Sequence, residues 1–176
     1  AINFQMREHE PDTCDRYLSP GCGNNYHPKI VDVGQFFSRK WKHKSDGFGL
    51  LIQLGVPRYS YATISATQSS DFIKYQEEQL QFIGLLNSNI RKYFTVRLSA
   101  EDEKYNKSKH LWSDRFPNVT IDNGMKSIYP LFSQSRLIIC TYAGTTYNQT
   151  IAANAPTVVF WDPKNTQVNK ISKLIF

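Results

Sequence analysis

The sequence has no long apolar run, few cysteines and no pattern of metal ligands. No stretch of about 18 apolar residues occurs, so it predicts no transmembrane helix. No signal peptide is visible at the start. The 3 cysteines lack metal-ligand spacing, and the 4 histidines are scattered along the chain. We therefore expect no metal site. We interpret the cysteines as reduced thiols, with a Cys14–Cys22 pair as the alternative, and Cys140 as a buried small hydrophobe in an apolar segment.

The fingerprints of nucleotide binding and nucleophilic catalysis are missing as well. No G-x-G-x-x-G dinucleotide motif occurs, and no glycine-rich loop ends in Gly-Lys-Ser or Gly-Lys-Thr. There is no Ser-His-Asp order in a convincing context, no Cys–His pair and no close pair of carboxylates. The catalytic residues are therefore unknown from the sequence, because no nucleophile and base can be paired.

What the sequence does contain fits one basic, well-cored domain. Hydrophobic residues make up 40% of the 176 residues, and the formal net charge is +6. A modest basic excess suits phosphate-bearing substrates or an anionic membrane surface, although ordinary solvated lysines give the same value. The lysines at 40, 42 and 44 form only a short cluster, so we expect no nucleic-acid partner. Because the chain starts without methionine and stops inside an expected helix, we expect a fragment of a longer protein.

Strands alternating with helices predict an α/β fold, a Rossmann-like parallel sheet with helices on both faces. The predicted strands span residues 48–54, 93–98, 119–121, 136–141 and 157–161. The predicted helices span 70–86, with Ser70 as the N-cap, then 103–116, 127–133 and 146–154, and a further helix begins at 168. Two short strands are candidates nearer the start, at 15–19 and 30–33.

The most informative stretch is RLIICTYAGTTYNQTIAANAPTVVFWDP, residues 136–163, which predicts a strand, a small-residue turn, a helix and a second strand. The turn holds Ala143, Gly144, Thr145 and Thr146, at the strand end where open α/β sheets bind ligands. Gly144 permits close approach to the backbone, and the threonines offer hydroxyls and capping. Free N–H groups at the helix start favour an anion such as phosphate. Most such turns bind nothing, so a purely structural turn remains the alternative.

This stretch resembles the late βαβ unit of the carboxyl-terminal domain in GT-B glycosyltransferases. It is most similar to a bacterial family of surface-polysaccharide transferases that carry S/T-T-x-x-E-x-x-A-x-N-x-P-T-I-x-F-W-x-P. It is more distantly similar to the CDP-glycerol glycerophosphotransferases of teichoic acid synthesis. Upstream motifs follow in the family's order: VPRYSY at 56–61, VRL at 96–98, DRFP at 114–117, IDNG at 121–124 and SRL at 135–137. The resemblance runs from residue 29 to residue 163.

The resemblance implies the donor-binding half of a GT-B transferase. Residues 1–28 would be the tail of a preceding domain and a linker, and 29–176 a Rossmann-like nucleotide-donor-binding domain truncated at its C-terminus. The donor would be a nucleotide-activated sugar or CDP-polyol, used as a substrate for surface polysaccharide synthesis, with no cofactor and no metal. The other partners implied are a missing N-terminal acceptor domain, which supplies the base, and a membrane surface. The implied location is cytoplasmic, with a peripheral position at the inner membrane face as an option.

The resemblance also raises a ligand-binding interpretation of two arginines and one aspartate. Arg58, in the matching Pro-Arg-Tyr-Ser, can clamp a phosphate, with a surface salt bridge as the alternative. Arg97 lies near the end of an apolar strand and needs a partner, either an acid across the sheet or the donor diphosphate. Asp122 opens an Asp-Asn-Gly turn that either approaches the nucleotide or is simply a turn.

Two departures from the family pattern affect the donor contacts. Ala100-Glu101 stands where relatives have Pro-His or a similar dipeptide. Gln149 stands where relatives have a Glu that takes a donor hydroxyl, and an amide cannot act as an anion. Asp162 lies at the same sheet edge and can bind a hydroxyl. The alternative function is therefore a non-catalytic nucleotide-binding or assembly module. The interpretation as a flavodoxin-like or response-regulator-like domain has less support, because residues 55–61 contain neither a cluster of acids nor a flavin-binding loop.

Overall fold

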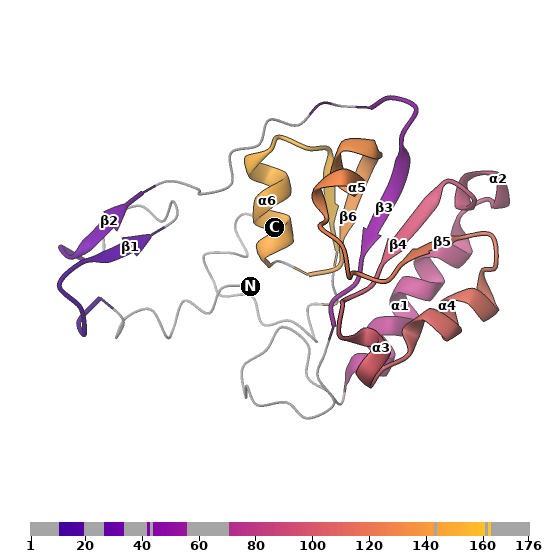
Figure 1. Ribbon diagram of the computed structural model, residues 1–176, viewed down its shortest axis with the longest axis horizontal. Coiled ribbons are helices and arrows are strands. Elements are labelled where there is room, and N and C mark those ends of the chain that lie inside the picture. The colour runs from indigo at the N-terminus through magenta and orange to yellow at the C-terminus, as the bar shows by residue number, and fades with distance from the viewer. Residues whose placement is uncertain are drawn as a thin grey trace.

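A five-stranded parallel sheet is the centre of the molecule (Figure 1). The computed structural model describes residues 11–19, 27–33, 42, 44–55, 71–142, 144–160 and 162. The sheet contains β3 (Phe48–Ile52), β4 (Phe94–Arg97), β5 (Thr120–Asp122), β6 (Ser135–Cys140) and β7 (Thr157–Val159). Its order is β5-β4-β3-β6-β7, and every pairing in it is parallel. The predicted α/β class and the five predicted strands are confirmed, with strand ends shifted by up to two residues.

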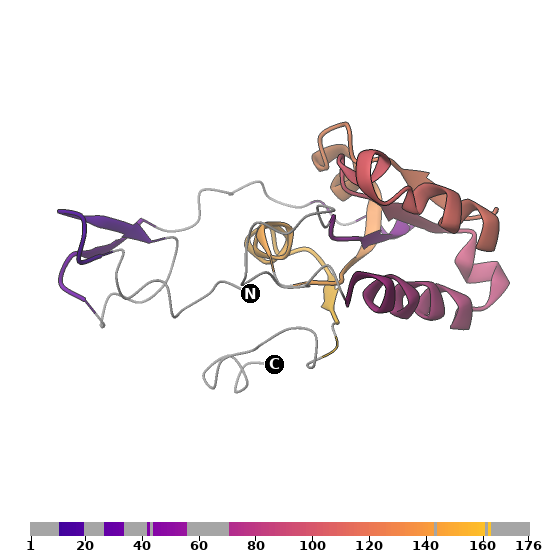
Figure 2. The ribbon, with the colours of Figure 1, turned by 90° about the horizontal axis from the view of Figure 1, so that it is seen from below.

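Helices cover both faces of this sheet. They are α1 (Phe72–Leu85), α2 (Ser88–Arg91), α3 (Asp102–Tyr105), α4 (Ser108–Arg115), α5 (Tyr129–Gln134) and α6 (Thr145–Ala152). Alternate strand residues enter two separate cores, as the period of two requires. Leu51 packs with the α1 and α4 side chains, whereas Leu50 and Ile52 pack with the α5 side chain Phe132. Figure 2 shows α1 and α6 on opposite sides of the sheet.

The prediction of one helix over 103–116 is wrong, because the chain forms α3 and α4 instead. Lys107 separates them in the left-handed conformation, at φ 51°. The cause is Asp102, only 3% exposed, whose carboxylate accepts hydrogen bonds from the backbone N–H of Ser108, at 2.8 Å, and from the Ser108 hydroxyl. This buried acid starts a new helix at Ser108. The single turn α2 was not predicted either. Asn87 caps it by accepting from the backbone N–H of Asn89 at 2.9 Å.

Two short strands near the start form a separate parallel pair. Strands β1 (Tyr17–Ser19) and β2 (Ile30–Asp32) are in register from Tyr17 opposite Ile30, which confirms both candidates. The predicted domain boundary at residue 28 falls between them and stays a prediction. The expected N-cap Ser70 and the helix expected from 168 lie outside the described residues. No helix among the described residues is long and apolar enough to cross a membrane.

Candidate functional site at the carboxyl edge of the sheet

The carboxyl ends of β3 and β6 flank the topological switch point of the sheet. From β3 the chain moves outward through β4 to β5, and then returns to the other side of β3 for β6 and β7. The helices that follow β3 and β6 therefore cover opposite faces of the sheet. Open α/β sheets bind ligands in the crevice that this divergence leaves at the carboxyl ends of the strands. The start of α6 follows β6 closely in the chain and lies at this point.

A buried hydroxyl cluster joins the ends of β3 and β6 at the switch point. The Thr141 hydroxyl, just after β6, donates to the backbone carbonyl of Ile52 at 2.8 Å. The Tyr75 hydroxyl, from α1, accepts from the backbone N–H of Leu54 at 2.7 Å and is hydrogen-bonded to the Thr141 hydroxyl. Burial raises the pKa of Tyr75 well above its ordinary value, so its hydroxyl stays neutral and able to donate. The sequence analysis missed this cluster.

The start of α6 differs in detail from the prediction. Gly144 occupies the N-cap at φ −138° and ψ −161°, which is extended backbone open to any residue. A Cβ there would lie 2.8 Å from Cδ2 of Tyr142, so ring packing accounts for the glycine. The expected capping by threonine is not observed, because Thr145 and Thr146 are themselves the first two helical residues. Their backbone N–H groups have no partner inside the helix. Thr145 is exposed and Thr146 is half-buried.

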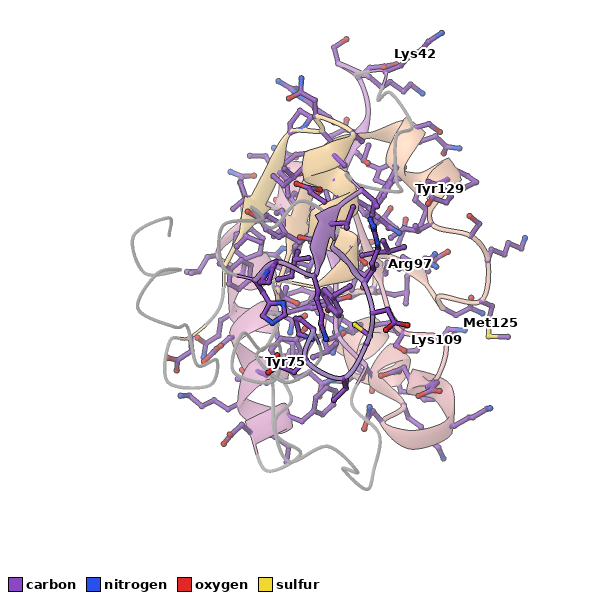
Figure 3. The ribbon with its side chains drawn as sticks, turned by 90° about the vertical axis from the view of Figure 1, so that its left-hand side faces the viewer. Lys42, Tyr75, Arg97, Lys109, Met125 and Tyr129 are labelled. Atoms are coloured by element: carbon purple, nitrogen blue, oxygen red, sulfur yellow. The ribbon has the colours of Figure 1, made fainter. Side chains whose placement is uncertain are left out.

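The guanidinium of Arg97, at the end of β4, is hydrogen-bonded to other residues of the chain (Figure 3). Its Nη1 donates to Oδ1 of Asp122 at 2.6 Å, and its Nη2 donates to the backbone carbonyls of Gly124, at 3.2 Å, and Lys126, at 2.6 Å. Of the two partners left open by the sequence, the acid across the sheet is therefore present. Asp122 also accepts from the backbone N–H of Gly124 at 3.0 Å, and Gly124 has a φ of 76°, so the Asp-Asn-Gly turn is present too.

Arg97 and the start of α6 lie at the same edge of the sheet, although β3 separates their strands. Tyr142 follows β6 and precedes α6 in the chain. Burial raises the pKa of Tyr142, while its hydrogen bond with Thr146 acts in the opposite direction.

The remaining predicted site residues lie farther apart or outside the described ranges. Asp162, after β7, accepts from Nζ of Lys74 on α1 at 2.7 Å. Gln149 is half-buried on the second turn of α6. Arg58 and Ala143 lie outside the described residues, and the binding roles of all four stay predictions. Across the described part of the chain, no group of three or more His, Cys, Asp or Glu side chains could hold a metal ion.

A buried amide next to the switch point was also missed by the sequence analysis. Gln53, directly after β3, is 3% exposed, and its Oε1 accepts from Nε1 of Trp112 at 2.9 Å. Its Nε2 has no hydrogen-bond partner, although a buried unpaired donor is costly. Gln79 on α1 is buried as well, and its Oε1 has no hydrogen-bond partner. Both glutamines are therefore buried polar side chains with one unpaired atom each.

The comparisons with known proteins identify a transferase family. A family model described as LIC12162 family transferase matches residues 4–176, almost the whole chain. Searches of the curated proteins and of the solved structures gave no match. The match agrees with the transferase that the resemblance over residues 29–163 implies, and it covers both the parallel sheet and the candidate site. The chain therefore belongs to the LIC12162 family of transferases.

Proposed function

We propose that this chain is the donor-binding half of a GT-B transferase. It binds a nucleotide-activated sugar, or a CDP-polyol donor, used in surface polysaccharide synthesis on the cytoplasmic side of the membrane. The acceptor and the catalytic base come from a second domain across the cleft. The GT-B likeness rests on the sequence motifs, and the transferase class rests on the family match.

One observation carries the proposal: the start of α6 lies at the switch point of the sheet. Backbone N–H groups and the helix dipole at this end favour a diphosphate. During transfer, negative charge develops on the nucleoside diphosphate leaving group. Preorganised N–H donors and a neighbouring guanidinium stabilise that charge without having to reorganise. The chemistry of the chain is thus electrostatic, and no proton transfer is assigned to it.

Arg97 takes part in one of two ways under this proposal. Its guanidinium keeps Asp122 and acts on the diphosphate through its field, or it exchanges Asp122 for a phosphate oxygen when the donor binds. The second way frees the Asp122 carboxylate for a hydroxyl of the donor. Gln149 and Asp162 are the other candidates for hydroxyl contacts.

Titration with UDP, CDP and GDP by calorimetry tests the proposal. At least one nucleoside diphosphate should bind, and its affinity should fall as salt rises, because the contact is between charges. The proposal would be contradicted if the folded protein gave no heat of binding in calorimetry and no chemical-shift change in NMR spectra at millimolar nucleotide.

The alternative is a non-catalytic nucleotide-binding or assembly module. The replaced residues Glu101 and Gln149 favour it, since an amide cannot take the place of an anion in donor binding. Binding and turnover separate the two functions. A full-length protein that binds nucleotide with normal affinity and transfers nothing to any surface-polymer acceptor supports the module.

A further inference from the structure

The end of the sheet opposite the candidate site presents three neighbouring chain segments side by side. These segments lead into β4, β3 and β6, the three central strands. The backbone N–H of Gly49 donates to the carbonyl of Tyr93 at 3.0 Å, which joins the first two segments. A Cβ at Gly47 would lie 2.8 Å from the backbone nitrogen of Arg136, which places the third segment against the second. The amino edge is thus a continuous surface.

Basic side chains dominate this edge. Lys44 precedes β3, Lys92 precedes β4, and Arg136 is the second residue of β6, and all three are exposed. Lys42, also exposed, lies at the same end, at the top of the view in Figure 3. Asp46 is the one acid in the segments that hold these bases, since no Asp or Glu occurs in residues 79–100 or 123–161.

Three large apolar side chains are exposed at the same edge, near Lys92. Leu85 is 88% exposed, Ile90 is 53% exposed and Tyr93 is 62% exposed. They come from the corner formed by the end of α1, by α2 and by the residue before β4, at the upper right of Figure 1. Nζ of Lys92 lies 5.2 Å from the centre of the Tyr93 ring, so basic and apolar groups are in contact.

The side chain of Arg91 stabilises the backbone of this corner. Nη2 of Arg91 donates to the backbone carbonyls of Gly84, at 2.7 Å, and Leu86, at 2.9 Å. Its guanidinium also lies over the ring of Phe116, 5.0 Å from the ring centre. Arg91 therefore fixes the backbone that carries Leu85 and Ile90. A backbone that is already fixed loses little further conformational entropy when a partner buries the side chains that it carries.

We propose that this amino-edge patch, made of Leu85, Ile90, Tyr93, Lys44, Lys92 and Arg136, docks the chain on a bilayer surface rich in anionic phospholipid. Apolar and aromatic side chains enter the headgroup region, while lysine and arginine pair with lipid phosphates. Nucleic acid fits less well, because Leu85 and Ile90 offer no hydrogen bond to a phosphate or a base. Docking by this edge turns the carboxyl edge, with the candidate site, away from the membrane. The proposal does not depend on the donor that the site binds.

Vesicle co-sedimentation of the whole 176-residue chain tests the proposal. Vesicles of phosphatidylcholine alone are compared with vesicles of equal parts phosphatidylcholine and phosphatidylglycerol. The chain should sediment with the anionic vesicles, less so at high salt, and should stay in solution with the neutral ones. Equal binding to both vesicle types, or no binding to either, would overturn the proposal. Binding to heparin without binding to anionic vesicles would point to a different polyanion and overturn it too.

Matched variants locate the contact. Lys92→Glu should weaken vesicle binding by about fivefold or more, because one basic residue near an anionic surface contributes that factor. Lys109→Glu is the charge-matched control, since Lys109 is exposed in the first turn of α4 and lies far from Lys42, below Arg97, in Figure 3. Leu85→Ser should also weaken binding. Ile73→Ser is its control at the opposite end of the same helix, where Ile73 is 79% exposed.

The controls decide between docking and general charge attraction. Lys109→Glu and Ile73→Ser should bind vesicles like the parent, with all four variants giving the parent's circular dichroism spectrum. If Lys109→Glu loses as much binding as Lys92→Glu, the attraction comes from net charge and the patch is not the docking surface. If Leu85→Ser binds as tightly as the parent, the apolar part of the proposal is wrong. Nucleotide affinity should be unchanged in Lys92→Glu, which separates this test from that of the candidate site.

Discussion

The guanidinium of Arg97 and the carboxylate of Asp122 lie 2.6 Å apart, on residues that are direct register partners in β4 and β5. Their side chains are 11% and 23% exposed, so water screens the pair only weakly. The pair joins the edge strand β5 to the rest of the sheet at its carboxyl end. It also sets the charge available to a ligand there.

Removing Arg97 should destabilise the fold more than removing the charge of Asp122. We expect Asp122→Asn to lower the free energy of unfolding by about 1.5–3 kcal/mol, the usual value for a hydrogen bond to a charged group, and Arg97→Met to lower it further, because Arg97→Met also removes the bonds to the carbonyls of Gly124 and Lys126. The double variant should cost less than the sum, because both changes remove the Arg97–Asp122 bond. Urea unfolding of the four proteins measures this. Additive costs would mean that the two side chains act independently.

The same two variants test whether Arg97 acts on the nucleotide at all. In either of its two proposed roles, Arg97→Met should lower nucleotide affinity, while Asp122→Asn, which removes a nearby negative charge, should keep or raise it. Equal losses in both variants would instead assign the pair to the sheet alone. Calorimetric titration of the two folded variants decides between these outcomes.

The Tyr75 hydroxyl should matter more than the Tyr142 hydroxyl. Tyr75→Phe removes the acceptor for Leu54 N–H and the partner of Thr141, so we expect a loss of about 1–3 kcal/mol of unfolding free energy. Tyr142→Phe is the matched control, because its hydroxyl lies 3.5 Å from the Thr146 hydroxyl, at the limit of a hydrogen bond. Equal losses in thermal or urea unfolding would show that the buried cluster does not hold the strand ends together.

The buried thiol of Cys140 gives a pH dependence with a definite sign. Burial raises the pKa of Cys140 from 9.0 to about 12. The unfolded chain therefore loses the thiol proton above about pH 9, while the folded chain keeps it. The free energy of unfolding should therefore be unaffected by this thiol below about pH 9. It should fall by up to about 1.4 kcal/mol per pH unit as the pH rises towards 12. Cys140→Ala should show a shallower decline in urea unfolding at alkaline pH. Identical slopes for variant and parent would contradict this assignment.

The left-handed residue between α3 and α4 offers a stabilising substitution. Lys107→Gly relieves a backbone cost of about 1–2 kcal/mol, partly offset by the greater freedom of glycine when unfolded. We expect a net gain of about 0.5–1 kcal/mol in unfolding free energy. Asn154→Gly, after α6 at φ 54°, should gain less, because asparagine tolerates this conformation better than lysine. A loss of stability in Lys107→Gly would contradict this account of the break between the helices.

The sheet could be predicted because its strands are buried on both faces. Leu50, Leu51 and Ile52 are all at most 4% exposed, and such unbroken apolar runs are visible in the sequence. The break at Lys107 could not be predicted, since it depends on the burial of Asp102, a tertiary effect. The acid partner of Arg97 was one of two alternatives, and only the register of β4 with β5 selects it.

The sequence could predict the location of the candidate site but not the contacts of its residues. The carboxyl end of β6 follows from the βαβ pattern of the sequence. The position of the switch point, by contrast, needs the strand order β5-β4-β3-β6-β7. The reason for Gly144 is its contact with the Tyr142 ring, which no local pattern indicates. A core-facing tyrosine such as Tyr75 must find a hydrogen-bond partner, and this rule was the one available signal for the buried cluster.

The central claim is that the start of α6 is an anion seat, and a pair of charge variants at Thr145 tests it most directly. Thr145 is exposed and is the first residue of α6, so either charge can be placed there without repacking the core. Thr145→Glu puts a carboxylate where a phosphate would bind, and it should stabilise the helix by about 0.3–1 kcal/mol through the dipole. Thr145→Lys should do the opposite to the helix. Gly144→Val is unsuitable for this purpose, since the added side chain would meet the Tyr142 ring.

The decisive measurement is the dissociation constant of the tightest nucleoside diphosphate for Thr145→Glu and Thr145→Lys, each compared with the parent. We predict that Thr145→Glu binds at least about tenfold more weakly despite equal or greater stability, because like charges at close range repel. Thr145→Lys should bind as well as the parent or better while being slightly less stable. If both variants bind the nucleotide as the parent does, the phosphates lie elsewhere and the start of α6 is not the anion seat.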